Sequence, residues 1–169
     1  YVTGKTGGGG LDGNTNSGSW DIFLVKYDSS GTKQWTKQLG TPEYDWGNGV
    51  IDSSGNIYLT GSTEGGLDGN TNSGGQDVFL VKFNSSGTKQ WTQQLGTSSW
   101  DFGSGVTTDS SGNIYVTGYT RGGLDGNTNS GSYDIFLVKY NSSGTKQWTK
   151  QLGTSSVDKG RGVTTDSSG

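Results

Sequence analysis

Short apolar stretches alternate along this chain with polar, glycine-rich segments. In the clearest part of the sequence, hydrophobic residues fill 135–138 (IFLV), and NIYVTG at 113–118 is a second short segment with β-branched and aromatic residues. Short segments of this kind between turn signals predict β-strands, and no stretch has the 3.6-residue period of an amphipathic helix. The pattern predicts four strands here, at 105–109, 113–118, 134–140 and 145–153.

Tight turns separate two pairs of these strands. DSSG at 109–112 and NSSG at 141–144 place Asp or Asn first and Gly fourth, as a type I turn prefers. Strands joined by such turns are antiparallel neighbours. We therefore expect one four-stranded antiparallel sheet from this part of the chain.

The same pattern occurs three times. The GGLDGNTNSG decapeptide begins at residues 9, 65 and 122, and KQW recurs with Trp35, Trp91 and Trp148, a spacing of about 57 residues. Units this similar are expected to stack beside one another and bury a shared core.

The apolar positions indicate how the sheets pack. Both faces of the 135–138 strand are apolar, so the sheet must be covered on both sides. In TKQWTKQL at 145–152, Lys146 and Lys150 accompany a single Trp and a single Leu, which suits an outer strand protected against edge pairing. The fold class predicted is all-β, a β-propeller of four-stranded antiparallel blades with about three blade equivalents in the chain.

The residues that define the repeat also resemble a known family. GVTTDSSGNIYVTGYT (105–120) followed by DIFLVKYNSSGTKQWTKQLGT (134–154) resembles the bacterial β-propeller repeat called SBBP, and the resemblance covers essentially the whole chain three times. GVTTDSSGNIYVTG is more distantly similar to the inner strands of NHL repeats. The resemblance implies a propeller blade in an extracellular or bacterial cell-surface protein, and it implies no shared catalytic chemistry.

The family's strand order, A to D from the centre outward, implies where each blade begins and ends. Blade 1 is expected at 1–47 (strands B, C and D), blade 2 at 48–104 (A to D), blade 3 at 105–161 (A to D), and strand A of another blade at 162–169. Because propellers usually have four to eight blades, we expect either an excerpt of a longer protein or association with further copies of the chain. Strand 162–166 could pair with residues 1–4, since the two segments match the two sides of one hairpin, and association of copies through this shared blade would give a ring or a filament.

Composition excludes several functions. The net charge is only -3 and no basic stripe is present, which argues against nucleic acid as a partner. No run of about 18 apolar residues is present, so no membrane span is expected. The chain has no Cys and no His, which excludes a thiol nucleophile, a Ser-His-Asp triad and His-liganded zinc within it.

Strand parity places the B–C and D–A loops on one face of the blades, where the repeats differ most in sequence. Aromatic and Arg side chains are common binding anchors. Those expected on this face are candidates for ligand binding, with packing against neighbouring loops as the alternative: Trp20, Tyr44, Trp46, Trp100, Phe102, Tyr119, Arg121 and Tyr133. Carbohydrate or a surface protein would be the partner.

The decapeptide carries alternating oxygen-bearing side chains, a pattern that calcium loops use. Its candidate metal ligands, copy by copy, are Asp12, Asn14, Asn16 and Asp21, then Asp68, Asn70, Asn72 and Asp77, then Asp125, Asn127, Asn129 and Asp134. The EF-hand pattern would need Gly where Ser17 stands and Glu where Phe23 stands. We therefore expect no cofactor and a self-bonded loop of Asx turns, with a weak Ca²⁺ site as the alternative.

Two functions follow from the sequence. The first is a non-enzymatic extracellular β-propeller repeat module that acts as a structural or assembly scaffold through blade-to-blade association. The alternative is a lectin-like or protein-binding propeller that uses the variable aromatic loop face. Trp20, Gln76 and Tyr133 occupy equivalent positions, and a sugar site repeated in every blade should not replace its stacking aromatic residue with Gln. This substitution favours the scaffold.

Overall fold

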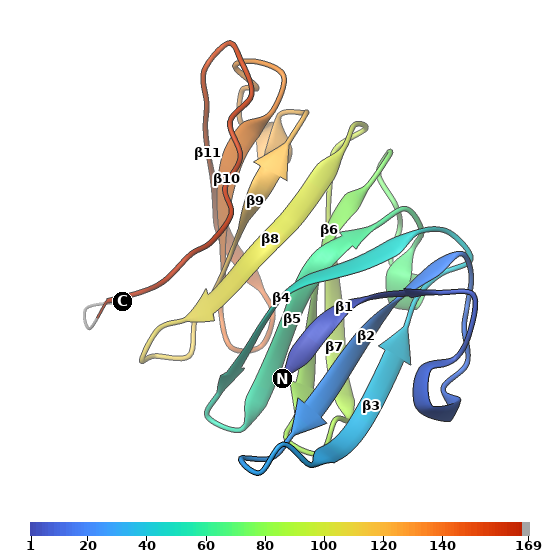
Figure 1. Cartoon of the computed structure of the whole chain (residues 1–169). Coiled ribbons are helices and arrows are strands. Elements are labelled where there is room, and N and C mark those ends of the chain that lie inside the picture. Colours follow the sequence, from blue (N-terminus) through green and yellow to red (C-terminus); the bar gives the residue numbers. More distant parts are fainter. Residues whose placement is uncertain (167–169) are drawn as a thin grey trace.

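The chain forms three antiparallel sheets that fan out side by side (Figure 1). The computed structural model describes residues 1–166. We call the sheets blades 1, 2 and 3, in chain order. Blade 1 contains β1 (Val2–Gly7), β2 (Trp20–Tyr27) and β3 (Lys33–Leu39). Blade 2 contains β4 (Asp45–Ser53), β5 (Asn56–Thr63), β6 (Asp77–Asn84) and β7 (Lys89–Leu95). Blade 3 contains β8 (Asp101–Thr108), β9 (Ile114–Thr120), β10 (Asp134–Tyr140) and β11 (Lys146–Leu152).

Strands follow one another in the order of the sequence within every blade. The innermost strands β4 and β8 lie next to each other, and β3, β7 and β11 form the outer edges (Figure 1). The predicted all-β repeat of antiparallel strands is therefore confirmed, with four strands in blades 2 and 3 and three in blade 1.

The predicted turns are held by their first residue. In blade 2, Asn84 Oδ1 accepts hydrogen bonds from the backbone N–H groups of Ser86 (3.1 Å) and Thr88 (2.8 Å). Asp28 and Asn141 make the equivalent bonds in the other two blades. A side chain that satisfies two backbone donors stabilises the reversal directly, which explains why every copy keeps Asp or Asn there.

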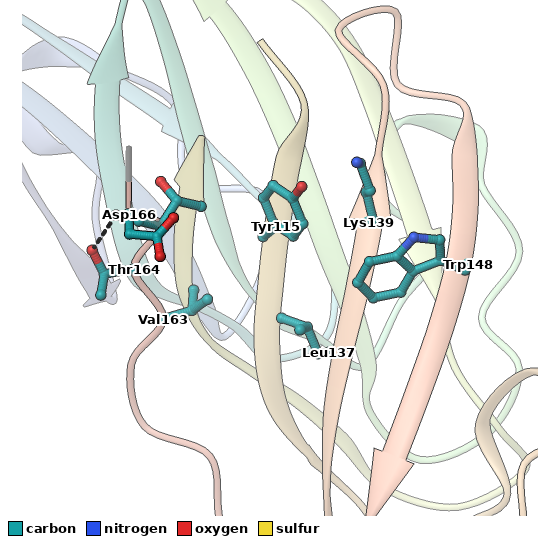
Figure 2. Close-up of a pocket in the computed structure, with 8 residues that line it drawn as sticks. Tyr115, Leu137, Lys139, Trp148, Val163, Thr164 and Asp166 are labelled. Carbon is teal, nitrogen blue, oxygen red and sulfur yellow. Dashed lines mark hydrogen bonds between the residues drawn. The ribbon is translucent and has the colours of Figure 1, made fainter. Parts of the chain in front are cut away.

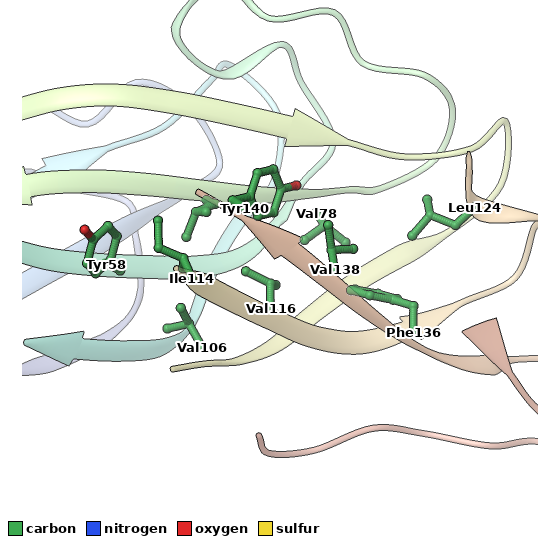
Figure 3. Close-up of a cluster of buried hydrophobic side chains, with 10 residues drawn as sticks. Tyr58, Val78, Val106, Ile114, Val116, Leu124, Phe136, Val138 and Tyr140 are labelled. Atoms are coloured by element: carbon green, nitrogen blue, oxygen red, sulfur yellow. The ribbon is translucent and has the colours of Figure 1, made fainter. Parts of the chain in front are cut away.

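The hydrophobic core lies between blades and not within any one of them. Tyr58, Val78 and Leu80 of blade 2 pack against the face of blade 3 that carries Phe136 and Val138 (Figure 3). A second cluster joins Ile22 and Leu24 of blade 1 to the corresponding face of blade 2. Burial of one such side chain is worth about 1.5–3 kcal/mol, so blade-to-blade contact supplies most of the stabilisation.

The chain beyond β11 differs from the strand expected at 162–169. Residues 162–166 form no strand, and 167–169 lie outside the described residues. The segment still contacts β8, because Thr165 Oγ1 donates a hydrogen bond to the Thr108 carbonyl (2.9 Å). Among the described residues β1 pairs with β2 alone, so the expected pairing of 162–166 with residues 1–4 does not occur within this chain.

Candidate functional site: the variable loop face

Loops from neighbouring blades meet on one face of the molecule. The backbone of Gln76, just before β6, forms an isolated parallel β-bridge with Trp100 in the loop between blades 2 and 3. The Asp101 N–H donates to the Gln76 carbonyl (2.7 Å). The Arg121 N–H, just after β9, donates to the Trp100 carbonyl (2.9 Å). The loop between blades 2 and 3 is thus tied by backbone hydrogen bonds to both blades.

Side chains on this face differ from one blade junction to the next. Between blades 1 and 2, Lys5 Nζ lies 4.5 Å from the ring centroid of Trp20 and 5.1 Å from that of Trp46. The Tyr44 ring stacks on Trp46 at 5.7 Å. Cation–π and stacking contacts fill this junction with side chains.

The junction after blade 3 holds a second aromatic and cationic cluster. The Tyr119 ring lies 4.8 Å from Phe102 and 5.4 Å from Tyr133. Lys159 Nζ lies over both tyrosine rings, at 4.8 Å from Tyr119 and 5.2 Å from Tyr133. Arg121, which is exposed, lies 5.7 Å from Tyr133.

The predicted ligand-binding residues therefore lie on one face but in separate clusters. Trp20, Tyr44 and Trp100 are 37–42% exposed, and the remaining aromatic residues are half-buried against one another. Several of these rings pack against one another, and ligand binding by the set remains a prediction. Sequence reasoning did not select Ser62, Gln76 or Asn48 as site residues, although these line a cavity between the clusters. They are polar and not aromatic, so the search for aromatic and Arg binding residues did not select them.

The decapeptide loops are bonded to the outer strand of their own blade. Asp68, at φ 54°, pairs through its carboxylate with Lys89 and Thr92 of β7. The Leu67 side chain is buried, and its N–H donates to Gln94 Oε1 (3.0 Å). Asp12 and Asp125 are held in the same way. In blade 1, hydrogen bonding from Lys33, followed by Thr36, lowers the pKa of Asp12.

The asparagines of the loop also have protein partners. Asn14, Asn70 and Asn127 each donate Nδ2 to the carbonyl of the Leu three residues before (2.7 Å). Asn16, Asn72 and Asn129 donate to backbone carbonyls of the loop and its flanks. These bonds agree with a self-bonded loop, and the calcium alternative remains a prediction.

Asp21, Asp77 and Asp134 lie at the start of β2, β6 and β10 and are fully buried. Asp77 Oδ2 accepts from the Ser73 N–H (2.8 Å) and from Gln94 Nε2 (3.1 Å), so it joins the loop to β7. Its Oδ1 has no hydrogen-bond donor among the described residues. A Cβ on Gly96 would lie 2.0 Å from that oxygen, which accounts for the glycine after the outer strand.

Two further buried carboxylates lie at the start of β4 and β8. Burial raises the pKa of Asp45 and Asp101, whose oxygens accept hydrogen bonds from threonine. Within residues 1–166, no three His, Cys, Asp or Glu side chains gather as a metal-ligand group. In the same part of the chain, no helix has the length and apolar character to cross a membrane.

Near-identical antiparallel sheets, buried against one another and carrying a variable loop face, define a repeat protein of the propeller type. Comparison of the sequence with known families gives the particular family. The chain belongs to the SBBP family, described as beta-propeller repeat, which matches residues 34–68, 90–125 and 147–169.

The chain is also similar in sequence to two larger proteins. The chain is 30% identical over 175 residues to an uncharacterized WD repeat-containing protein, L264, of Acanthamoeba polyphaga mimivirus, a match that covers 86% of this chain and 13% of that protein. It is 28% identical over 173 residues to the regulatory protein FlaEY of Caulobacter vibrioides, covering 93% of this chain and 18% of that protein. The chain thus spans less than a fifth of either relative.

Proposed function

We propose that this chain is a non-catalytic scaffold module, extracellular or on a bacterial surface, that assembles by stacking blade on blade. One observation carries the proposal: a face that is covered in blades 1 and 2 is open in blade 3. Trp91 and Leu95 of blade 2 pack against the core shared with blade 3. Their equivalents Trp148 and Leu152 are 36% and 74% exposed.

The open face of blade 3 has the shape and chemistry of an unfilled blade contact. A cavity of about 510 Å³ lies between the C-terminal segment and β9 to β11, lined by Tyr115, Leu137, Lys139, Trp148 and residues 163–166 (Figure 2). The equivalent Tyr58 and Leu80 of blade 2 are 3% and 1% exposed because blade 3 covers them. A further blade of the same type would cover the blade 3 residues in the same way.

Blade 1 exposes the complementary half of this contact. Val2 and Tyr27 are 50% and 44% exposed. Their equivalents in blade 3, Val116 and Tyr140, are buried against blade 2, at 1% and 4%. The two end faces are therefore the two halves of a contact that the chain already makes twice internally.

The occupant we propose is a second copy of the chain, placed head to tail. A head-to-tail contact closes into a ring or extends into a filament, depending on its rotation. The absence of His and Cys from the chain and the non-catalytic character of repeat scaffolds support a structural function. In a longer parent protein, the next repeat would fill the same face.

The test is the mass of the 169-residue chain in solution as a function of concentration. We expect light scattering to show oligomers at micromolar concentration, and electron microscopy to distinguish rings from filaments. Leu152→Glu on blade 3 and Val2→Glu on blade 1 should each abolish association, while Thr71→Glu in an exposed decapeptide loop should not. A folded monomer throughout, or oligomers that survive both end-face substitutions, would overturn the proposal.

A further inference from the structure

A small cavity opens on the variable loop face at the junction of blades 2 and 3. Its volume is about 210 Å³, and it is lined by Trp46, Asn48, Ser62, Gln76, Phe102 and Tyr119. Three of these are aromatic, the other three are neutral and polar, and none carries a formal charge at neutral pH. The cavity is smaller than the 300–1,000 Å³ typical of sites for drug-sized ligands, so it suits a single small ring.

Sequence differences between the repeats explain why the cavity lies here. Ser62 and Gln76 occupy positions that hold Lys5 and Trp20 in blade 1, and Tyr119 and Tyr133 in blade 3. In blade 1 the larger pair packs together, with Lys5 Nζ 4.5 Å from the Trp20 ring. Tyr119 and Tyr133 likewise make an edge contact at 5.4 Å. Blade 2 alone has a small side chain and an amide at these positions.

Gln76 supplies an unused polar group at this cavity. The residue is 2% exposed, and its Nε2 donates to Glu64 Oε1 (2.9 Å). Its Oε1 is buried without a hydrogen-bond donor among the described residues. Such an acceptor is costly to bury unless a donor reaches it. Asn48 is held at the rim by its own bond to the Gly103 carbonyl (2.8 Å), which leaves its Oδ1 to accept.

We infer that this cavity binds one neutral pyranose ring, as a free glycoside or as a unit of an oligosaccharide. The apolar C–H groups of the sugar contact those parts of the Trp46, Phe102 and Tyr119 side chains that line the cavity, beside the contacts that these rings make with Tyr44, Lys5 and Lys159. One of its hydroxyls donates to Gln76 Oε1, and others bond Asn48 and the Ser62 hydroxyl. The absence of charged side chains from the lining favours neutral over acidic sugars.

Gln76 argues against a sugar site repeated in every blade, because its equivalents are aromatic. The same glutamine is required for a single site in blade 2, because Trp or Tyr at this position would fill the cavity. The site lies inside one chain, so it is independent of the assembly proposed above.

The experiment is saturation-transfer NMR on the full chain, whatever its state of association, with methyl glycosides of glucose, galactose, mannose and N-acetylglucosamine. Glycerol serves as the control for weak polyol contact. We expect at least one glycoside to bind with saturable, millimolar affinity. Ser62→Tyr and Gln76→Tyr introduce the residues that blade 3 carries at these positions, and each should weaken binding at least tenfold.

Two further variants keep the result decisive. Trp20→Gln makes the reverse exchange in blade 1, outside the cavity, and should leave the affinity unchanged. Asn48→Ala changes an exposed rim residue and should weaken binding several-fold, even if a tyrosine variant fails to fold. The inference is overturned if no glycoside saturates, or if binding survives in the folded Ser62→Tyr, Gln76→Tyr and Asn48→Ala proteins.

Discussion

Three equivalent leucines should differ in their contribution to stability, according to whether a next blade covers them. Leu24 and Leu80 are 0% and 1% exposed, each packed in a core shared with the following blade. Leu137, at the same position in blade 3, is only half-buried and lines the open cavity. The three residues share strand position and neighbours within their own blade, so they form a matched series.

Truncation of each leucine to alanine gives the magnitudes. Leu24→Ala and Leu80→Ala remove a buried side chain and leave a cavity, which costs about 2–5 kcal/mol. Leu137→Ala loses a smaller transfer free energy and leaves no enclosed cavity, so it should cost about 1 kcal/mol.

The assay is urea unfolding followed by tryptophan fluorescence, at a protein concentration where the chain is monomeric. The free energies of unfolding should rank Leu137→Ala above both other variants. Equal losses of unfolding free energy at all three positions would show that the core lies within single blades, and would refute a core shared between neighbouring blades. At concentrations where chains associate, the cost at Leu137 should approach that at Leu80.

Three further predictions concern the backbone, the buried carboxylates and the decapeptide. Gly118→Ala would place a Cβ 1.8 Å from the Phe102 carbonyl oxygen and should lower the free energy of unfolding by about 3 kcal/mol. Gly9→Ala, whose Cβ would have no atom within 4 Å, should change that free energy by less than about 0.5 kcal/mol. Thermal melting of both variants checks this, and equal effects would contradict the close approach of the Phe102 carbonyl to Gly118. Burial raises the pKa of Asp101, so at a pH between the unfolded and the raised folded pKa the folded chain binds more protons than the unfolded chain. The stability from this group is present at acid pH and lost as pH rises through the raised pKa. Asp101→Asn should therefore reduce the fall in unfolding free energy between about pH 4 and 7. Urea unfolding at several pH values measures this, and a fall with pH equal to that of the unmodified chain would count against it. Because Asp68 already pairs with Lys89, Ca²⁺ should leave the melting temperature unchanged relative to a chelator control, and a rise that Asp68→Ala abolishes would establish the metal site instead.

Much of the fold could be predicted from the sequence, because each strand and turn is encoded locally. The apolar run at 135–138 and the Asn of each NSSG turn act within a few residues of themselves. The repeat then applies the same pattern to every blade. The strand expected at 162–166 is absent because a strand needs a hydrogen-bonded neighbour, and none of the described strands pairs with this segment.

The candidate site was less accessible to sequence reasoning. The loop partners of Asp68 lie 21 and 24 residues later on β7, and nothing local indicates that pairing. The cavity at blades 2 and 3 depends on what Ser62 and Gln76 lack relative to their equivalents. A small side chain leaves a cavity only where the neighbouring blade encloses the space, so the cavity cannot be inferred from one repeat alone.

The two end faces have a consequence for how such proteins change length. Every blade carries the same pair of complementary faces, so adding or removing one whole repeat of about 57 residues leaves both ends of the stack unaltered. Duplication within the gene therefore changes the number of blades without disturbing the joint between them. The copies differ most on the loop face, so a new binding site can arise in one blade while the contacts between blades are kept.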